Sequence, residues 1–514
     1  MKYLVIAGYF AVLLAIGAVA SRRVRGISDY YVGGKRLGYW VVAFSARASG
    51  ESAWLYLGLT GLGALVGARA FWVVVGELVG VSIAWFCMAR PFKAATDRYE
   101  SITIPDYLVS RFGGSGDERP ARALRLVSAV ALALFVTIYV SAQIDATGKA
   151  FHGFLDWNYH LGAVVGFAIV VVYTLSGGFV AVAWSDLFQG VLMLVGLVVL
   201  PLAAGAMLMG QPGSWLSALP SEHASLWGAG GASLSNTLII VSYLAIGLGF
   251  LGSPQVFVRF MAIRDQGEIA AGRWVAIVFT IVTDGCAVLS GMLGHALLVG
   301  AGGDFSAVLG ADGERVLPEL VSLLFPVMIV GLYVAAVLAA IMSTIDSLLL
   351  VASSAITRDV YQQMWRPEAR PEALMGMSRR TTLALATLAL MMALTVSIIS
   401  PDRTIFWYAI FGWSGIGATF CPVIVLALLW PRYNVWGALA SMITGAFCVP
   451  LFKFAVPLIP VWGPIVSQAE ELAPSFLLAL VAGTLATWAT HDRTGDGVVP
   501  SRNGSFESHW ENRR

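Results

Sequence analysis

The chain has 514 residues, of which 58% are hydrophobic and only 12% are charged, whereas soluble domains carry a charged share of about 25%. This composition excludes an ordinary soluble protein and predicts an all-α protein that crosses a membrane many times. The formal net charge of +2 is too small to indicate a nucleic-acid partner, which requires a clustered basic surface.

Apolar runs of about 20 residues, the length of a membrane-spanning helix, recur along the whole chain. We predict thirteen spans, at 2–20, 39–64, 70–89, 123–150, 159–178, 183–209, 234–258, 274–299, 319–355, 381–400, 404–430, 434–456 and 473–490. The first run could instead belong to a signal peptide, because Ala18-Val19-Ala20 resembles a cleavage site, but Lys2 is the only charge before it.

The basic residues indicate the orientation in the membrane. Most of the 32 Lys and Arg residues fall in every second loop, among them the connections near 90–122 and 358–380. Since cytoplasmic loops are enriched in Lys and Arg, we expect a multi-pass cell (inner) membrane protein with its N-terminus outside and its C-terminus in the cytoplasm. The polar segment 491–514 is then expected to be a disordered cytoplasmic tail.

The sequence contains no recognisable catalytic motif. It has no Gly-rich phosphate loop, no Ser/His/Asp arrangement and no metal-ligand spacing among its six histidines and four cysteines. We therefore expect that the chain is not an enzyme and has no organic cofactor. Its expected partners are the lipid bilayer and a small-molecule solute.

Seven ionisable side chains lie at membrane depth within the predicted spans: Arg47, Glu51, Glu77, Asp145, Asp186, Asp284 and Asp346. A charge at the bilayer centre costs about 2.5–3.5 kcal/mol, so each must face protein or water and is a functional candidate. For Glu77, Asp145 and Asp284 we favour hydrogen bonds that link helices, with Asp145 and Lys149, four residues apart, as a local pair.

Two predicted spans are interrupted in the middle. Small residues fill 45–53 in the second span, and the seventh contains GLGFLGSP from Gly247 to Pro254. Proline removes a helical hydrogen bond, and the freed carbonyls must then face protein or a cavity. Breaks at matching places five helices apart favour an inverted-repeat transporter with its site at the breaks, although helix packing through glycines gives a similar pattern.

The ninth span carries hydroxyl groups that could face the first break. Ser343 and Ser347 are four residues apart on one helix face, with Thr344 beside them. Hydroxyl and carbonyl oxygens suit an alkali cation, although Ser and Thr in membrane helices more often bond to their own backbone. The nearby interrupted span favours the cation site.

Four segments resemble the sodium/solute symporter family, nearest to its sodium/proline branch. They are YYVGGKRLGYW (Tyr30–Trp40), SITIPDY (Ser101–Tyr107), GGFVAVAWSDLFQG (Gly177–Gly190) and MSTIDSLLLVASSAITRDVY (Met342–Tyr361). The resemblance runs from about Tyr30 to Leu429 and implies a LeuT-type fold. In that fold two inverted five-helix repeats, 39–209 and 234–430, would follow one helix and a loop at 1–38 and precede two helices at 431–490.

The resemblance also implies ion sites. The main sodium site would use the backbone carbonyls of Ala48, Glu51 and Ala340 and the hydroxyl oxygens of Ser343 and Thr344. Asp186, Asp346 and Ser347 match a second cation site of some family members. Asp346 stands where the family usually has a neutral residue, so it could strengthen that site, take up a proton or pair with Arg47.

The resemblance places the solute between the two breaks. The residues expected to line it are Arg47, Ser52, Ala53, Tyr139, Ile246 and Phe250. The proline branch has an aspartate at the position of Gly50, a glycine at Arg47, a tryptophan at Ile246 and a tyrosine at Phe250. These departures change the hydrogen-bond donors around the solute and put proline in doubt as the substrate.

Three interpretations of Arg47 remain open. Arg47 and Glu51 are helical neighbours and could form a buried ion pair that fixes the broken span. Arg47 could instead bind a substrate carboxylate, with Glu51 or Asp346 balancing its charge. Finally, Glu51 or Asp346 could take up a proton and couple transport to protons.

The sequence thus predicts a secondary active transporter that imports a small organic solute with sodium by alternating access. Proline or a related amino acid is the first expectation, and another small carboxylate, such as a monocarboxylate or a pantothenate-like compound, is the alternative, driven by sodium or protons. A solute sensor would need a signalling module after Trp488, and a channel would need a continuous polar pore lining, neither of which the sequence indicates.

Overall fold

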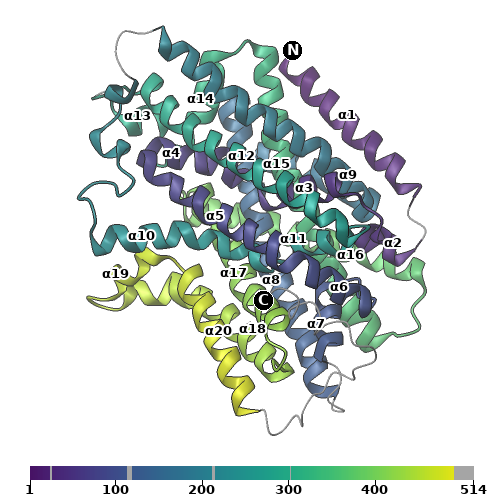
Figure 1. Ribbon diagram of the computed structural model, residues 1–514. Helices are drawn as coiled ribbons and strands as arrows, with labels where there is room; N and C mark the ends of the chain where they lie inside the picture. The colour runs from purple at the N-terminus through teal and green to yellow at the C-terminus, as the bar shows by residue number, and fades with distance from the viewer. Residues whose placement is uncertain (24–25, 113–117, 211–214, 301, 491–514) are drawn as a thin grey trace.

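The computed structural model describes residues 1–23, 26–112, 118–210, 215–300 and 302–490 (Figure 1). Its α-helices are α1 (Lys2–Ser21), α2 (Ile27–Val32), α3 (Tyr39–Gly50), α4 (Thr60–Val66), α5 (Phe71–Ile83), α6 (Ala89–Arg98), α7 (Ile104–Phe112), α8 (Glu118–Leu155), α9 (Tyr159–Met209), α10 (Leu234–Ala245), α11 (Pro254–Ala262), α12 (Ile269–Leu298), α13 (Phe305–Leu309), α14 (Val316–Leu324), α15 (Val327–Ser354), α16 (Pro371–Ile399), α17 (Ile405–Leu429), α18 (Val435–Pro450), α19 (Gly463–Val466) and α20 (Leu472–Ala489). In these ranges β-pairing is limited to one isolated bridge between Leu37 and Ile263, so the fold is all-α as expected. The tail predicted to be disordered, 491–514, lies outside the described residues.

Eleven segments in the described parts of the chain are long and apolar enough to cross a membrane, and a shorter apolar helix lies at Tyr159–Val172. The predicted count of thirteen is therefore not confirmed. Two predicted spans, 159–178 and 183–209, are joined in α9 through a kink at Gly178, whose φ of 61° favours glycine. The second predicted span is divided among α3, the π-helical η2 (Trp54–Leu59) and α4.

The predicted span 319–355 has different limits in the structure. Helix α14 ends at Leu324, and α15 begins only at Val327. Between them, Phe325 is extended, with φ of −128° and ψ of 148°, because the following Pro326 disfavours the helical conformation of the residue before it. The prediction therefore joined a short helix to a separate membrane helix.

Helix α15 is the central element of the bundle. Every residue from Tyr333 to Ala355 is buried. In Figure 1, α15 and α3 lie in the middle, α1 lies along one edge, and α18 and α20 lie at the opposite end. Helix α1 packs against α9 and α15, where Gln189 donates to the Tyr9 hydroxyl at 3.0 Å. This packing favours a membrane helix over a signal peptide.

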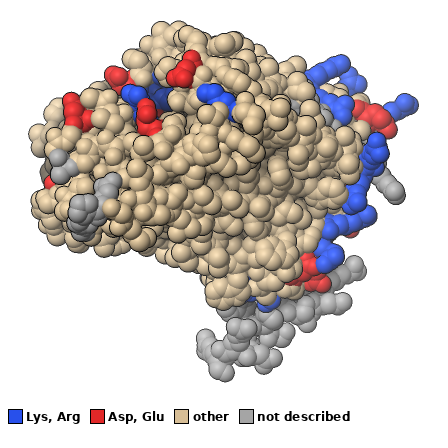
Figure 2. All heavy atoms as spheres, turned by 90° about the horizontal axis from the view of Figure 1, so that it is seen from above, with Lys and Arg blue, Asp and Glu red and all other residues tan. Residues whose placement is uncertain are grey.

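The exposed surface is mostly apolar between two charged ends. Figure 2 shows a broad uncharged belt, with Lys and Arg gathered at one end and charges of both signs at the other. Not every basic residue assigned to a loop from the sequence lies at the surface. Arg259 and Lys93 are 1% and 2% exposed, respectively, so both belong to the interior of the bundle.

Both predicted breaks are present, and they face each other. Helix α3 ends at Gly50, and Glu51 is extended, with φ of −78° and ψ of 153°. After α10 the chain forms the 3-10 helix η7 (Ile246–Leu251) and an extended Ser253 before α11 starts at Pro254. A Cβ added to Gly50 would lie 2.7 Å from Cε1 of Phe250, so the two breaks pack directly against one another.

Candidate sodium and solute sites

The end of α3 leaves backbone carbonyls without helical partners. The last hydrogen bond of the helix runs from the Glu51 amide to the Arg47 carbonyl, at 2.8 Å. The Ala48 carbonyl instead accepts from the Ser343 hydroxyl at 2.9 Å, and the Glu51 carbonyl accepts from the Thr344 hydroxyl at 2.6 Å. Small residues around the break weaken the helix and let α15 approach closely enough for these contacts.

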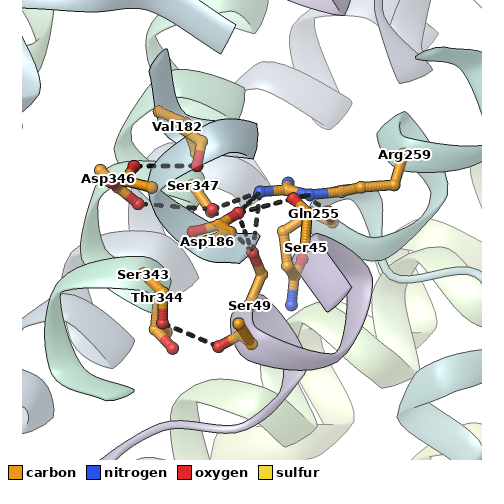
Figure 3. A network of polar contacts seen from close by, with 12 residues as sticks. Ser45, Ser49, Val182, Asp186, Gln255, Arg259, Ser343, Thr344, Asp346 and Ser347 are labelled. Atoms are coloured by element: carbon orange, nitrogen blue, oxygen red, sulfur yellow. Dashed lines mark hydrogen bonds and ion pairs between the residues drawn. The ribbon is translucent and has the colours of Figure 1, made fainter. Parts of the chain in front are cut away.

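The structure brings all five predicted sodium ligands together. Besides their contacts with α3, the Ser343 and Thr344 hydroxyl oxygens both lie 3.1 Å from the Ala340 carbonyl oxygen. Ala48, Glu51, Ala340, Ser343 and Thr344 are all fully buried. The result is a water-excluded group of five neutral oxygens that joins the broken α3 to α15. Figure 3 shows Ser343 and Thr344 of this group.

The residues predicted for a second cation site also meet, but around an arginine. Figure 3 shows the Arg259 side chain, from α11, reaching between α3, α9 and α15. Its Nη2 is 3.1 Å from Asp186 Oδ2 and 2.7 Å from Ser49 Oγ, and it also donates to Ser347 Oγ. Asp346 contacts the Ser347 hydroxyl at 3.5 Å, and its Oδ2 has no hydrogen bond.

Sequence reasoning missed Arg259 in this group. It comes directly after the predicted span 234–258, so the sequence places it in the loop that follows. The structure continues the helix through Ala262, and this places the guanidinium beside Asp186. The available signal was the apolar run PQVFVRFMA, in which one arginine is surrounded by residues that favour burial.

The predicted solute residues gather around the meeting point of the two breaks. The Tyr139 hydroxyl donates to the Ser52 hydroxyl at 3.4 Å. The ring of Phe250 lies 4.8 Å from that of Trp413, whose indole nitrogen donates to the Ile246 carbonyl at 2.9 Å. All of these side chains are at most 2% exposed, so the site is closed to water in this conformation.

Two residues of this region were not predicted. Gln143 accepts the Ala53 amide at 3.1 Å through Oε1, while its Nε2 is buried without a partner. Trp413, on α17, packs on both Phe250 and Tyr139. Gln143 could have been found, because it lies four residues after Tyr139 and shares its helix face. Trp413 belongs to the site only through its packing on Phe250 and Tyr139, and the sequence around Trp413 does not reveal these contacts.

Arg47 has more carboxylate partners than the sequence indicated. Its Nη2 pairs with Glu51, as one interpretation predicted, and also lies 2.9 Å from Glu77 Oε2 and 4.0 Å from Asp284 Oδ2. Asp346 is not among its partners in the described part of the chain, so of the three roles left open for Asp346 the structure does not support pairing with Arg47. Glu77 and Asp284 do link helices, as favoured, but through ion pairs to Arg47.

The predicted local pair of Asp145 and Lys149 is also wrong. Asp145 pairs with Arg403, from the loop before α17, and accepts the Tyr159 hydroxyl. Lys149 instead lies 2.7 Å from Glu314. Spacing along one helix could not reveal these partners because they come from other segments.

Known proteins that are similar to this chain belong to one family. The family model described as the sodium:solute symporter family matches residues 30–445. The chain is 34% identical to the osmoregulated proline transporter OpuE of Bacillus subtilis, over 94% of this chain and 93% of that protein. It is 36% identical to the high-affinity proline transporter PutP of Bacillus subtilis, over 86% and 90%. The sodium/proline symporter of Escherichia coli is 34% identical, over 87% and 86%.

Solved structures support the fold. A sodium-coupled sialic acid symporter matches with a TM-score of 0.75 at 18% identity, over 95% of this chain and 98% of that one. The transporter MhsT, in complex with L-phenylalanine, matches with a TM-score of 0.52 at 15% identity, over 87% and 98%. The architecture is thus that of the LeuT-fold transporters. The chain belongs to the sodium:solute symporter family, and it is a multi-pass cell-membrane protein that performs sodium-coupled solute symport and is not an enzyme.

Proposed function

We propose that this protein imports proline or a closely related amino acid together with sodium bound at the break of α3. The relatives above are named for proline transport. The observation that carries the proposal is the meeting of three carbonyl oxygens, from Ala48, Glu51 and Ala340, with the hydroxyls of Ser343 and Thr344. Hard, neutral oxygens of this kind fit a desolvated sodium ion.

Sodium at this position would couple the ion to the solute. It would hold the extended Glu51 against α15, and Ser52 and Ala53, which follow directly, would then take fixed positions in the solute site. Because each ligand orders the site for the other, the two share one coupling free energy. Release to the cytoplasm would be favoured by the membrane potential, at about 2.3 kcal/mol per charge per 100 mV.

At the second site we propose that the Arg259 guanidinium takes the place of a second sodium ion. It already donates to Asp186, Ser49 and Ser347, the kinds of oxygen that a cation would use. A tethered guanidinium cannot leave with the solute, so it would still balance Asp186 after the solute is released. Replacing Arg259 with methionine should therefore make the sodium dependence of uptake steeper than in the wild type.

The alternative substrate is a small carboxylate bound by Arg47. The observation in its favour is that Nε and Nη1 of Arg47 are buried without hydrogen-bond partners. Against it, Nη2 already contacts Glu51 and Glu77. An amino acid is favoured because its ammonium group offsets this negative surrounding.

The orientation proposed is an outer N-terminus and a cytoplasmic C-terminus, supported by the Lys and Arg gathered at one end in Figure 2. A protease added outside intact cells should then cut a tag at the N-terminus and spare one at the C-terminus.

Uphill uptake tests the function. Purified protein in proteoliposomes should accumulate radiolabelled L-proline above the external concentration under an inward sodium gradient, and should stop when the gradient is collapsed. Lactate and pantothenate serve as the carboxylate alternatives. With a channel or a sensor, the internal solute concentration would never exceed the external one. Failure of all three solutes to accumulate above their external concentration would contradict the proposal.

A further inference from the structure

A buried group of charged side chains lies beside the solute site and has no role in the proposed sodium cycle. We call it the Arg47 cluster. It consists of Arg47 from α3, Glu51 from the residue after α3, Glu77 from α5 and Asp284 from α12. None of the four is more than 1% exposed. Since α12 packs against both α3 and α5, the cluster joins three helices in the interior.

The three carboxylates are close enough to share one ligand. One oxygen of each lies within 4.8 Å of an oxygen of the other two. Glu51 Oε2 and Glu77 Oε1 are buried and have neither a hydrogen bond nor an ion pair within the described part of the chain, whereas Glu51 Oε1 and Asp284 Oδ2 contact only Arg47. Buried polar atoms normally have partners, so these oxygens, directed into one cluster, indicate a ligand.

The charges of the Arg47 cluster do not balance. Three carboxylates surround one guanidinium, a formal charge of −2, and Arg47 is the only basic residue that pairs with any of the three in the described ranges. Unbalanced charge is costly in a buried site. The proposed sodium at the Glu51 carbonyl supplies one positive charge. With all three carboxylates ionised and all of that charge assigned to the cluster, one negative charge still needs a counterpart, either a bound cation or a proton on one carboxylate.

The Arg47 cluster borders the predicted solute site. The guanidinium carbon of Arg47 lies 4.8 Å from the centroid of the Phe250 ring, which in turn packs on Trp413. Arg47 is itself one of the residues expected to line the solute site, and the Phe250 ring that it contacts packs on Trp413 within that site.

We propose that the Arg47 cluster binds one monovalent cationic group, ligated by the carboxylates of Glu51, Glu77 and Asp284. The group is either the ammonium of the solute or an alkali ion from solution, which present the same chemistry to the carboxylates. This inference rests on the proposed sodium site, which supplies the first positive charge. It restricts the solute class to compounds with a cationic nitrogen when the ammonium is the source.

Two opposite changes of charge test the proposal in the purified full-length protein. Glu77→Gln removes one negative charge at nearly constant volume, so the affinity for the cationic group should fall about tenfold. Arg47→Gln removes the positive charge, so the same affinity should rise by about the same factor. Damage to the fold would weaken binding in both variants, so opposite directions distinguish the effect of charge. Glu471→Gln, which alters a buried carboxylate paired with Lys453, is the matched control and should match the wild type.

Ligand-dependent thermal stabilisation measures the affinity, because a ligand of the folded state raises its stability by mass action. Sodium chloride alone reports the alkali ion. At constant sodium, pyrrolidine reports an ammonium without a carboxylate, and cyclopentanecarboxylate reports a carboxylate without an ammonium. Opposite shifts of the sodium curve identify an alkali ion, and opposite shifts of the pyrrolidine curve identify the ammonium of the solute.

The proposal is overturned if neither the sodium curve nor the pyrrolidine curve shifts in opposite directions in Glu77→Gln and Arg47→Gln. The Arg47 cluster would then be a structural ion network. Failure of the sodium site has a different signature. In that case the double variant Ser343→Ala with Thr344→Ala would be stabilised by sodium as strongly as the wild type is. The pyrrolidine shifts of Glu77→Gln and Arg47→Gln would still report on the Arg47 cluster.

Discussion

Gly50 occupies the closest contact between the two breaks. An added Cβ would lie 2.7 Å from Cε1 and 3.3 Å from Cζ of Phe250. The ring cannot retreat freely, because it is held between the Trp413 ring and the Arg47 guanidinium. The aspartate that the proline branch has at this position would therefore collide with Phe250 unless the ring moved.

We expect Gly50→Ala to destabilise the protein by about 1–3 kcal/mol, because overpacking in a buried site forces neighbouring side chains from their preferred rotamers. Adding Phe250→Leu should restore most of the loss, since it removes the ring edge that the new methyl group meets. The measurement is the midpoint of thermal unfolding. Gly285→Ala is the control, because a Cβ at Gly285 meets no atom within 4 Å. A loss of stability that Phe250→Leu does not relieve would contradict this account.

Glu314 lies outside the membrane-spanning segments and links α8 to the start of α17. Its Oε1 accepts the backbone amides of Ile405 and Phe406 at the start of α17, and its Oε2 lies 2.7 Å from Lys149 Nζ. Burial raises the pKa of Glu314 from 4.5 to about 7, although the Lys149 ammonium lowers it. The folded state therefore holds a proton over a pH range in which the unfolded chain has released it.

This raised pKa predicts the direction of a pH dependence. The contribution of Glu314 to stability is fully present below pH 4.5 and is lost as the pH rises through about 7. Glu314→Gln should abolish this part of the pH dependence, which is on the order of 3 kcal/mol at most. Thermal unfolding between pH 5 and 8 measures it, with the exposed Glu319→Gln as the control. An identical pH slope in Glu314→Gln and wild type would refute the assignment.

At the scale of elements, one ion pair ties α8 and α9 to the loop before α17. Arg403 pairs with Asp145 on α8 and donates to the Tyr159 hydroxyl of α9 at 2.9 Å. Asp145 is fully buried, and the Arg403 side chain is only 10% exposed. Breaking such a pair leaves a buried charge without compensation, which is more costly than the pair itself is stabilising.

We therefore expect Arg403→Gln to destabilise the protein by about 3–5 kcal/mol. The double variant Arg403→Gln with Asp145→Asn should recover most of this loss, because it leaves no charge behind. A double-mutant cycle of thermal stability gives the coupling. Additive effects of the two substitutions would show that the residues are not coupled.

The elements also show why some contacts could be predicted and others could not. The breaks in α3 and between η7 and α11 follow from local signals, a run of small residues and Pro254. The division of α14 from α15 was equally local, since Pro326 stood in the sequence, but the continuous apolar run obscured it. By contrast, the partners of Asp145 come from α9 and the loop before α17, and helical spacing carries no information about them.

For the whole molecule, the family resemblance predicted the fold and the five oxygens proposed to hold sodium, because these lie in motifs that can be read residue by residue. The ion pairs among Arg47, Glu77 and Asp284 could not be predicted, because three helices far apart in the sequence must pack before their side chains meet. Arg259 was misplaced because loop assignment treats every basic residue near a span end as exposed. Trp413 and the partners of Arg47 are thus positioned by tertiary packing, whereas Gln143 and Arg259 carried local signals in the sequence.

The central claim is that sodium joins the broken α3 to α15. Its most direct test is the sodium concentration that gives half-maximal solute uptake in Ser343→Ala with Thr344→Ala. We predict an increase of about tenfold or more, because two cation ligands are lost. The control is Ser353→Ala with Ser354→Ala, two hydroxyls further along α15 that donate to Leu350 and Val351 carbonyls, and it should match the wild type. An unchanged sodium dependence in the first variant would contradict the account.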